Sequence, residues 1–201
     1  GIGHLTRKCG LAIDNLLEAD VVLADGRFVT ASQDEHADLF WAIRGGGGNF
    51  GVVTSFLFRL HPIDTVYAGP MFWPLEKSAE IMRWYREFIT NAPDEINGFF
   101  AFHTVPPAAP FPEHLHNQKI AAIVWCYTGP LDQAEGVFAP IRERFGPPVL
   151  DWVGPIPHPA LQGLFDGLYP PGYQWYWKAD FVNELSDEAI ERHVEFGATL
   201  P

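Results

Sequence analysis

The stretch Ile43-Arg44-Gly45-Gly46-Gly47-Gly48-Asn49-Phe50-Gly51-Val52-Val53-Thr54-Ser55 organises the first part of the chain. Glycine has no side chain to pack, and it loses more backbone entropy on ordering than any other residue. A run of four glycines is therefore tolerated where the backbone must adopt a positive φ or must approach something bulky. The β-branched and aromatic run that follows, residues 52–60, predicts a buried strand. This order of elements indicates a backbone surface that lies against a ligand.

The glycine run also has a simpler interpretation, which the residues leave open. Gly45 can be the residue just after a helix C-terminus, with a flexible turn behind it. Two phosphate-binding motifs are excluded. Gly46, Gly48 and Gly51 have the spacing G-x-G-x-x-G, but here the motif ends a helix and opens a strand, the reverse of a dinucleotide-binding fold. No Gly-Lys-Ser/Thr follows, so the stretch is not a Walker phosphate-binding loop.

Composition excludes several classes of protein. The 201 residues are 47% hydrophobic and 14% aromatic, which is enough for a folded core. The net charge of −12 argues against binding to nucleic acid or to an anionic membrane. No apolar run reaches the roughly 18 residues of a membrane span.

The ends and the cysteines give little information on location. Cys9 and Cys126 are too few for a disulfide framework, and we interpret them as small packed side chains. They do not identify the cellular compartment of the protein, for which we slightly favour the cytoplasm. Because the chain opens at Gly1-Ile2-Gly3 without a methionine or a signal peptide, we expect it to be part of a longer protein.

Local patterns predict a hairpin and a helix before the glycine run. Strands over residues 20–24 and 27–31 are joined by Asp25-Gly26, which is typical of a type I′ turn. Ser32-Gln33-Asp34-Glu35 has the capping-box pattern, so a helix is expected from there to about Arg44. The apolar side chains of this helix that should face inward are Leu39, Phe40 and Ile43.

His61-Pro62 looks like a boundary, and beyond it the order of elements is strand, helix, strand, strand, helix, strand. The strands are expected over residues 65–73, 99–104, 120–127 and 149–153, and the amphipathic helices over residues 75–91 and 131–145. This is the split βαβ pattern, which predicts an antiparallel sheet with helices on one face. A short helix near residues 160–165, a strong strand over residues 173–182 and a helix capped by Ser186 complete the chain.

No constellation for nucleophilic or metal catalysis emerges from the sequence. The motifs G-x-S-x-G, H-E-x-x-H and C-x-x-C are absent. His114 and His116 lie near Glu113 in a proline-rich loop, but no further ligand has a suitable spacing. A solvated loop is therefore favoured there over a metal site.

Residues 173–181 form the most suggestive segment for catalysis. Strand alternation would divide the segment into two faces, with Tyr173, Trp175, Trp177 and Phe181 on one and Gln174, Tyr176, Lys178 and Asp180 on the other. The polar face would look either into a cavity or into solvent, and the pattern alone slightly favours solvent. If a cofactor lies against this face, Tyr176 and Lys178 are the candidates for orienting the substrate or assisting proton transfer, and Gln174 for binding it.

Three segments together resemble a known family. They are Gly1-Ile2-Gly3-His4-Leu5 with the residues up to Leu16, Ala24-Asp25-Gly26, and Asp38-Leu39-Phe40-Trp41-Ala42-Ile43-Arg44 with the glycine run up to Thr54. Their order and spacing resemble the FAD-linked oxidoreductases of the vanillyl-alcohol-oxidase superfamily, in its berberine-bridge-enzyme-like branch. That branch includes hydroxynicotine and oligosaccharide oxidases.

The resemblance implies an α+β fold. Residues 1–62 would be the C-terminal part of a PCMH-type FAD-binding domain. Residues 63–201 would be an antiparallel-sheet substrate-binding domain with helices on one face, incomplete at its C-terminus.

The resemblance also implies a flavin site. The FAD-binding residues it points to are Gly1, Gly3, Leu5, Asn49, Gly51, Val52 and Val53. The family oxidises an alcohol or a C–N bond by hydride transfer to the flavin. The expected partners are therefore FAD and a small organic or carbohydrate substrate, with homo-oligomerisation left open.

Departures from the family pattern keep an alternative open. In the family, a pyrophosphate-binding loop and an often FAD-linked histidine precede the part that matches Gly1, and a closing segment follows the part that matches Pro201. Cys9 stands where the family often has tyrosine. The alternative is a truncated, non-catalytic module that folds but binds no flavin.

Overall fold

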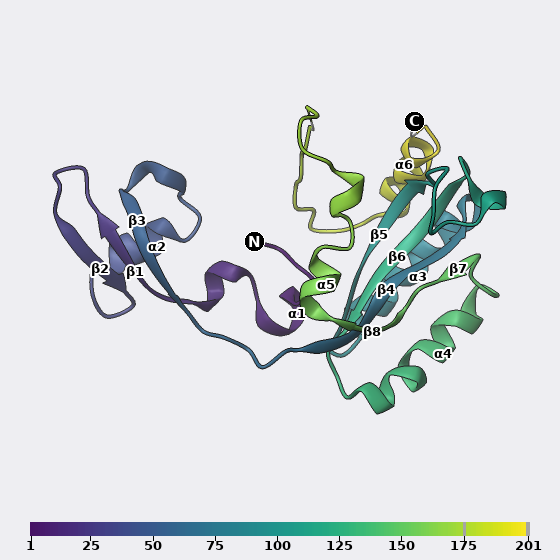
Figure 1. Cartoon of the computed structure of the whole chain (residues 1–201), viewed down its shortest axis with the longest axis horizontal. Helices are drawn as coiled ribbons and strands as arrows, with labels where there is room; N and C mark the ends of the chain where they lie inside the picture. Colours follow the sequence, from purple (N-terminus) through teal and green to yellow (C-terminus); the bar gives the residue numbers. More distant parts are fainter. Residues whose placement is uncertain (175, 200–201) are drawn as a thin grey trace. The chain divides into compact units, whose positions relative to one another are not determined.

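The structure is a computed structural model of the chain that describes residues 1–174 and 176–199. The chain divides into two compact units, Gly1–Pro62 and Ile63–Pro201, and each is described by itself (Figure 1). The assignment of these units to an FAD-binding half and a substrate-binding domain stays a prediction. Within the described ranges, no helix combines the length and the apolar composition needed to cross a membrane.

The first unit is a three-stranded antiparallel sheet with the order β2-β1-β3. Its elements are α1 Thr6–Cys9, η1 Ala12–Asn15, β1 Leu16–Val22, β2 Phe28–Ser32, α2 Ala37–Ile43, η2 Gly47–Asn49 and β3 Val52–Phe58. Helix α2 buries Phe40 against Ala19, Val21 and Ala31 of the sheet, and Leu39 and Ile43 pack around them. The prediction of the inward side of this helix is therefore confirmed.

The hairpin turn between β1 and β2 is not the predicted type I′ turn. The backbone N–H of Leu23 donates to Arg27 O, and that of Gly26 donates to Leu23 O, which leaves a three-residue loop. Of Ala24, Asp25 and Gly26, only Gly26 has a positive φ, at 83°. A type I′ turn requires a positive φ at two successive residues. Asp25 instead fixes the turn, because its carboxylate accepts hydrogen bonds from Arg27 N at 3.1 Å and Arg27 Nε at 2.7 Å.

Helix α2 begins later than the capping-box pattern predicts. Ser32 Oγ does accept hydrogen bonds from the backbone of Asp34 and Glu35, at 3.3 and 3.1 Å. Ser32 is the last residue of β2, however, and the helix begins at Ala37 after His36, whose φ is 46°. The serine therefore closes a turn between strand and helix.

The second unit is an antiparallel sheet with the order β5-β6-β4-β7, and β8 also pairs with β4 (Figure 1). Its strands are β4 Thr65–Pro74, β5 Ile96–Thr104, β6 Lys119–Tyr127, β7 Leu150–Asp151 and β8 Gly154–Pro157. Its helices are η3 Leu75–Lys77, α3 Ser78–Asn91, η4 Glu113–Leu115, η5 Leu131–Gln133, α4 Ala134–Arg144, α5 His158–Gln162, η6 Asp166–Leu168 and α6 Asp187–Gly197. The predicted α+β fold is confirmed, and so is the cap of α6, in which Ser186 Oγ accepts from Ala189 N at 3.2 Å.

Helices α3 and α4 cover one face of this sheet. The core that they share with β4, β5 and β6 contains Met71, Trp73, Ile81, Ile96, Ile123, Trp125, Phe138 and Ile141. Ala134, Phe138 and Ile141 form the apolar stripe predicted for α4, and all three are buried. Trp125 contacts the rings of Trp84, Tyr85, Phe88 and Phe138 edge to face. Such aromatic packing adds to the free energy gained by burial.

The strand predicted over residues 173–182 is wrong. Residues 173, 174 and 176–182 form neither strand nor helix, and Trp175 lies outside the described residues. The side chain of Tyr176 is 87% exposed and that of Phe181 is 85% exposed. Alternating side chains specify a strand only where a neighbouring strand supplies backbone hydrogen bonds. In the described part of the chain, no strand pairs with this segment.

The sequence also missed strand β8, because Pro155 and Pro157 lack the N–H groups that a ladder needs. Proline is tolerated at an edge, and among the described strands β8 pairs with β4 alone. Its neighbour β7 covers two residues of the five expected over residues 149–153.

We expect the substitution Phe138→Ala to lower the free energy of unfolding by about 3–5 kcal/mol, because it removes a fully buried ring and leaves a cavity. Urea denaturation followed by circular dichroism measures the change. The matched substitution Phe196→Ala removes a ring that is 69% exposed and should change stability by less than about 0.5 kcal/mol. Equal effects of the two substitutions would contradict this account of the core.

Candidate functional site

The predicted flavin-facing residues at the N-terminus form an open, locally bonded segment. Gly3 N donates to Thr6 Oγ1 at 2.8 Å, and Gly1 O accepts from Ala12 N at 3.1 Å. Leu5 lies directly before helix α1. A Cβ added to Gly1 or Gly3 would meet no atom within 4 Å. This unobstructed backbone fits the close approach of a flat ligand.

The glycine run is required largely by the protein itself. Gly45 and Gly47 have φ values of 118° and 73°, which a residue with a side chain rarely adopts. A Cβ on Gly46 would lie 2.3 Å from Ala42 O, and Asn49 Nδ2 donates to Gly46 O at 3.2 Å. The interpretation as a helix end with a turn therefore explains these three glycines.

Gly48 and Gly51 differ in their surroundings. A Cβ on Gly48 would meet nothing within 4 Å, so this part of the run leaves room for a ligand. Gly51 has a φ of 141°, and its Cβ would lie 2.6 Å from Val22 O. The requirement for glycine at position 51 is therefore explained by the close approach of β1. Its role in binding FAD stays a prediction.

Val52 and Val53 lie on opposite sides of β3. Val53 packs against the core of the first unit, but the other residues of β3 are exposed, so the predicted burial of this strand is wrong. Val52 is 68% exposed and stands in register with Val22, which in turn pairs with Phe28. The three side chains form an apolar row across the sheet, on the side away from α2. Such a row fits contact with an uncharged, flat group.

The predicted substrate residues Gln174, Tyr176 and Lys178 are exposed and lie outside regular structure. None of the three lines either of the two hollows described below, so their roles stay predictions. The candidate metal ligands also gain no support. His116 Nε2 lies 3.0 Å from Phe111 O within its own loop, and among the described residues no three metal-binding side chains gather.

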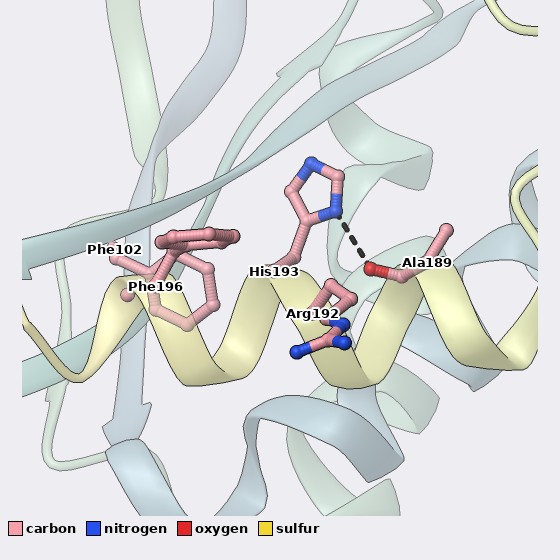
Figure 2. A pocket seen from close by; sticks show the side chains of 6 residues that line it. Phe102, Ala189, Arg192, His193 and Phe196 are labelled. Carbon is pink, nitrogen blue, oxygen red and sulfur yellow. Dashed lines mark hydrogen bonds between the residues drawn. The ribbon is translucent and has the colours of Figure 1, made fainter.

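One hollow lies beside α6, with a volume of about 590 Å³ (Figure 2). Its lining residues are Phe102, Ala189, Arg192, His193, Phe196 and Gly197. His193 Nδ1 lies 2.8 Å from Ala189 O, and because a carbonyl oxygen only accepts, Nδ1 is the donor. Arg192 already pairs with Glu195 at 2.8 Å. The hollow can hold an apolar group but offers no acid–base pair.

The opposite face of the second sheet carries a different set of side chains. Strand register places these residues on it: Ala68, Pro70 and Phe72 of β4, Ala122 and Val124 of β6, and Phe99, Ala101 and His103 of β5. We call it the His103 face. The loop residues Val105, Phe111 and Leu115 cover one end of it.

His103 is the group on this face that is able to transfer protons. Burial lowers the pKa of its imidazole below the ordinary value, so the ring is mostly uncharged at neutral pH. Its ring lies 5.7 Å from that of Phe111, measured between centroids. The thiol of Cys126 shares the face, but burial raises its pKa to about 12 and leaves it protonated.

A second, smaller hollow of about 180 Å³ opens on the His103 face. Its lining residues are Ala68, Gly69, Pro70, Trp152, Gly154, Pro155, Ile156 and Leu164. Sequence reasoning missed it. Residues of β4, β8 and the turn after α5 meet there only through strand register, which no local pattern reveals.

Comparison with known proteins identifies relatives of the chain. No protein-family model matches it. An FAD-linked oxidoreductase of Dictyostelium discoideum is 32% identical over 194 residues, which are 95% of this chain and 40% of the relative. The xylooligosaccharide oxidase of Thermothelomyces thermophilus is 31% identical over 210 residues, covering 98% of this chain and 39% of the relative.

Solved structures agree with these relatives. The 6-hydroxy-D-nicotine oxidase of Arthrobacter nicotinovorans superposes with a TM-score of 0.68 at 30% identity, over 86% of this chain and 36% of that one. A berberine-bridge-enzyme-like protein of Physcomitrella patens gives a TM-score of 0.62 at 25% identity, over 87% and 35%.

The fold and these likenesses define a member of the vanillyl-alcohol-oxidase superfamily. The chain belongs to its FAD-linked oxidoreductases, as the motifs in residues 1–54 predict. It spans about 40% of the length of the curated relatives that it matches over nearly its whole length. The names of these homologues indicate FAD as the cofactor of the group.

We expect Gly51→Ala to destabilise the chain by about 1–3 kcal/mol, because the new Cβ would meet Val22 O and the φ of 141° disfavours any side chain. Gly48→Ala, which meets open space, is the matched control and should leave the free energy of unfolding nearly unchanged. Chemical denaturation of both variants measures the difference. A stable Gly51→Ala variant would show that β1 and β3 are not packed as described.

Proposed function

We propose that the chain contributes flavin- and substrate-binding parts of an FAD-dependent oxidoreductase. The reaction is the oxidation of an alcohol or a C–N bond of a small organic or carbohydrate substrate by hydride transfer to the flavin. The observation that carries the proposal is the likeness to FAD-linked oxidoreductases over 95% of this chain. Two oligosaccharide oxidases among the similar proteins favour a carbohydrate-like substrate.

The first unit supplies the contacts to FAD in this proposal. The residues assigned to it are Gly1, Gly3, Leu5, Asn49, Gly51, Val52 and Val53. Gly1, Gly3 and Gly48 leave their backbone open to a neighbouring group, and the apolar row with Val52 can cover a flat one. When bound, the cofactor accepts the hydride, and the protein orients the substrate and excludes water.

The second unit supplies the contacts to the substrate. Tyr176 and Lys178 are the candidates for holding the reacting hydroxyl or amine and for moving its proton as the hydride leaves. Gln174 is the candidate for a hydrogen bond to a substrate hydroxyl. The assignment is based on the spacing of these three side chains in the sequence, and all three are exposed in the structure.

The test uses the full-length gene product purified with FAD. Tyr176→Phe and Lys178→Ala are expected to lower kcat/KM by roughly 100-fold or more, the usual contribution of a proton-transfer group. Tyr173→Phe, which removes the same hydroxyl from the other alternating set, should leave the rate unchanged. Unchanged turnover in both of the first two variants would contradict the substrate assignment. A full-length protein without flavin absorbance after incubation with FAD and desalting would contradict the proposal as a whole.

A further inference from the structure

The hollow on the His103 face has a lining without any ionisable side chain. Its lining includes Ala68 and Pro70 of β4 together with Trp152, Ile156 and Leu164. Binding an ion there would remove its hydration without supplying a compensating charge. The lining therefore favours an uncharged occupant with apolar surface.

Trp152 is held in place before any ligand arrives. Its backbone N–H donates to Pro70 O at 3.0 Å, and its carbonyl lies so close to Gly69 that a Cβ there would be 2.3 Å away. Its ring meets Phe72 edge to face at 5.4 Å and is tilted against Phe111 at 4.9 Å. The indole is still 37% exposed. Because the indole is already ordered and partly accessible, little side-chain entropy is lost when a ring binds against it.

The size of the hollow limits what can occupy it. An apolar cavity of roughly 150 Å³ is known to hold one benzene molecule. The hollow of about 180 Å³ is therefore large enough for a six-membered ring.

A series of ring contacts on the same face leads from Trp152 at the hollow to His103, which does not itself line the hollow. Trp152 contacts Phe111, and Phe111 contacts His103. The imidazole is half-buried and mostly uncharged near pH 7, so it can exchange a hydrogen bond with a hydroxyl without introducing a charge. The mostly apolar lining of the hollow, with an aromatic side chain at its edge, is the usual composition of a small-molecule site.

We propose that the hollow beside Trp152 is a subsite for one uncharged six-membered ring, and that Trp152 determines its specificity. The ring belongs to a sugar or to an aromatic compound, which both present apolar faces to an indole. The inference deepens the proposed function by naming where a ring of the substrate lies, but the binding itself requires no turnover. The larger hollow beside α6 is a poorer candidate, because the Arg192–Glu195 pair lies at its rim.

Ligand-observed saturation-transfer NMR on the full-length protein tests the proposal with three probes. Benzyl alcohol represents the aromatic ring, methyl β-D-xyloside the sugar ring, and benzoate a charged ring of similar size. We expect at least one of the two uncharged probes to bind, and benzoate to bind at least tenfold more weakly. Stronger binding of benzyl alcohol or of the xyloside decides between the aromatic and the sugar source. Binding of neither uncharged probe would overturn the proposal.

Two substitutions localise the binding. Trp152→Ala removes the wall and is expected to weaken binding at least tenfold. Gly154→Leu fills the hollow, because a Cβ there meets no atom within 4 Å, and should abolish binding even if loss of the indole disturbs the fold. The matched controls are Trp41→Ala, which removes an indole that is 74% exposed in the first unit, and Gly136→Leu, whose added side chain also starts in open space.

The outcomes separate this inference from the proposed function. The subsite would be overturned if Gly154→Leu bound the probe as tightly as the unsubstituted protein, or if Gly154→Leu and Gly136→Leu weakened probe binding equally. This holds even if the enzyme is an active flavoprotein. Conversely, the full-length protein could bind no flavin while probe binding is lost only in the variants Trp152→Ala and Gly154→Leu. That result would support the subsite and contradict the proposed oxidoreductase function.

Discussion

The pairing of β6 with β4 and β5 is the constraint on which the second unit depends. From Ile120 to Tyr127 every residue of β6 is buried, and strand geometry sends alternate side chains to opposite faces. Ile123 and Trp125 pack against helices α3 and α4, whereas Ala122 and Val124 belong to the His103 face. A shift of the register by one residue would exchange the two sets, so the core and the hollow cannot be altered independently.

The sequence was sufficient for the elements that depend on local periodicity. The stripe of Phe138 and Ile141 and the strand of β6 are specified by residues a few positions apart, and the structure confirms both. The errors occur where a distant partner decides. Residues 173–182 alternate in sequence as a strand does, but among the described residues no neighbouring strand pairs with them. Ser32 has the right spacing for a helix cap, but in the structure it is the last residue of β2.

The candidate site could be predicted only in part, for a related reason. The motifs around Gly3 and Gly51 indicated a flavoenzyme by resemblance, although the structure explains Gly51 by the packing of β1 against β3. Trp152 and His103 carry no local signal. Each contacts Phe111, which belongs to a loop far from Trp152 in the sequence.

The charges of the chain and the composition of the hollow favour the same kind of substrate. With 25 acidic and 13 basic residues, the chain repels anions at long range, although salt screens this beyond about 8–10 Å. At short range the hollow beside Trp152 offers no cation to compensate an anion for its lost hydration. His103 adds none near neutral pH, because burial lowers its pKa. An uncharged ring therefore meets neither penalty, whereas a carboxylate of the same size would meet both.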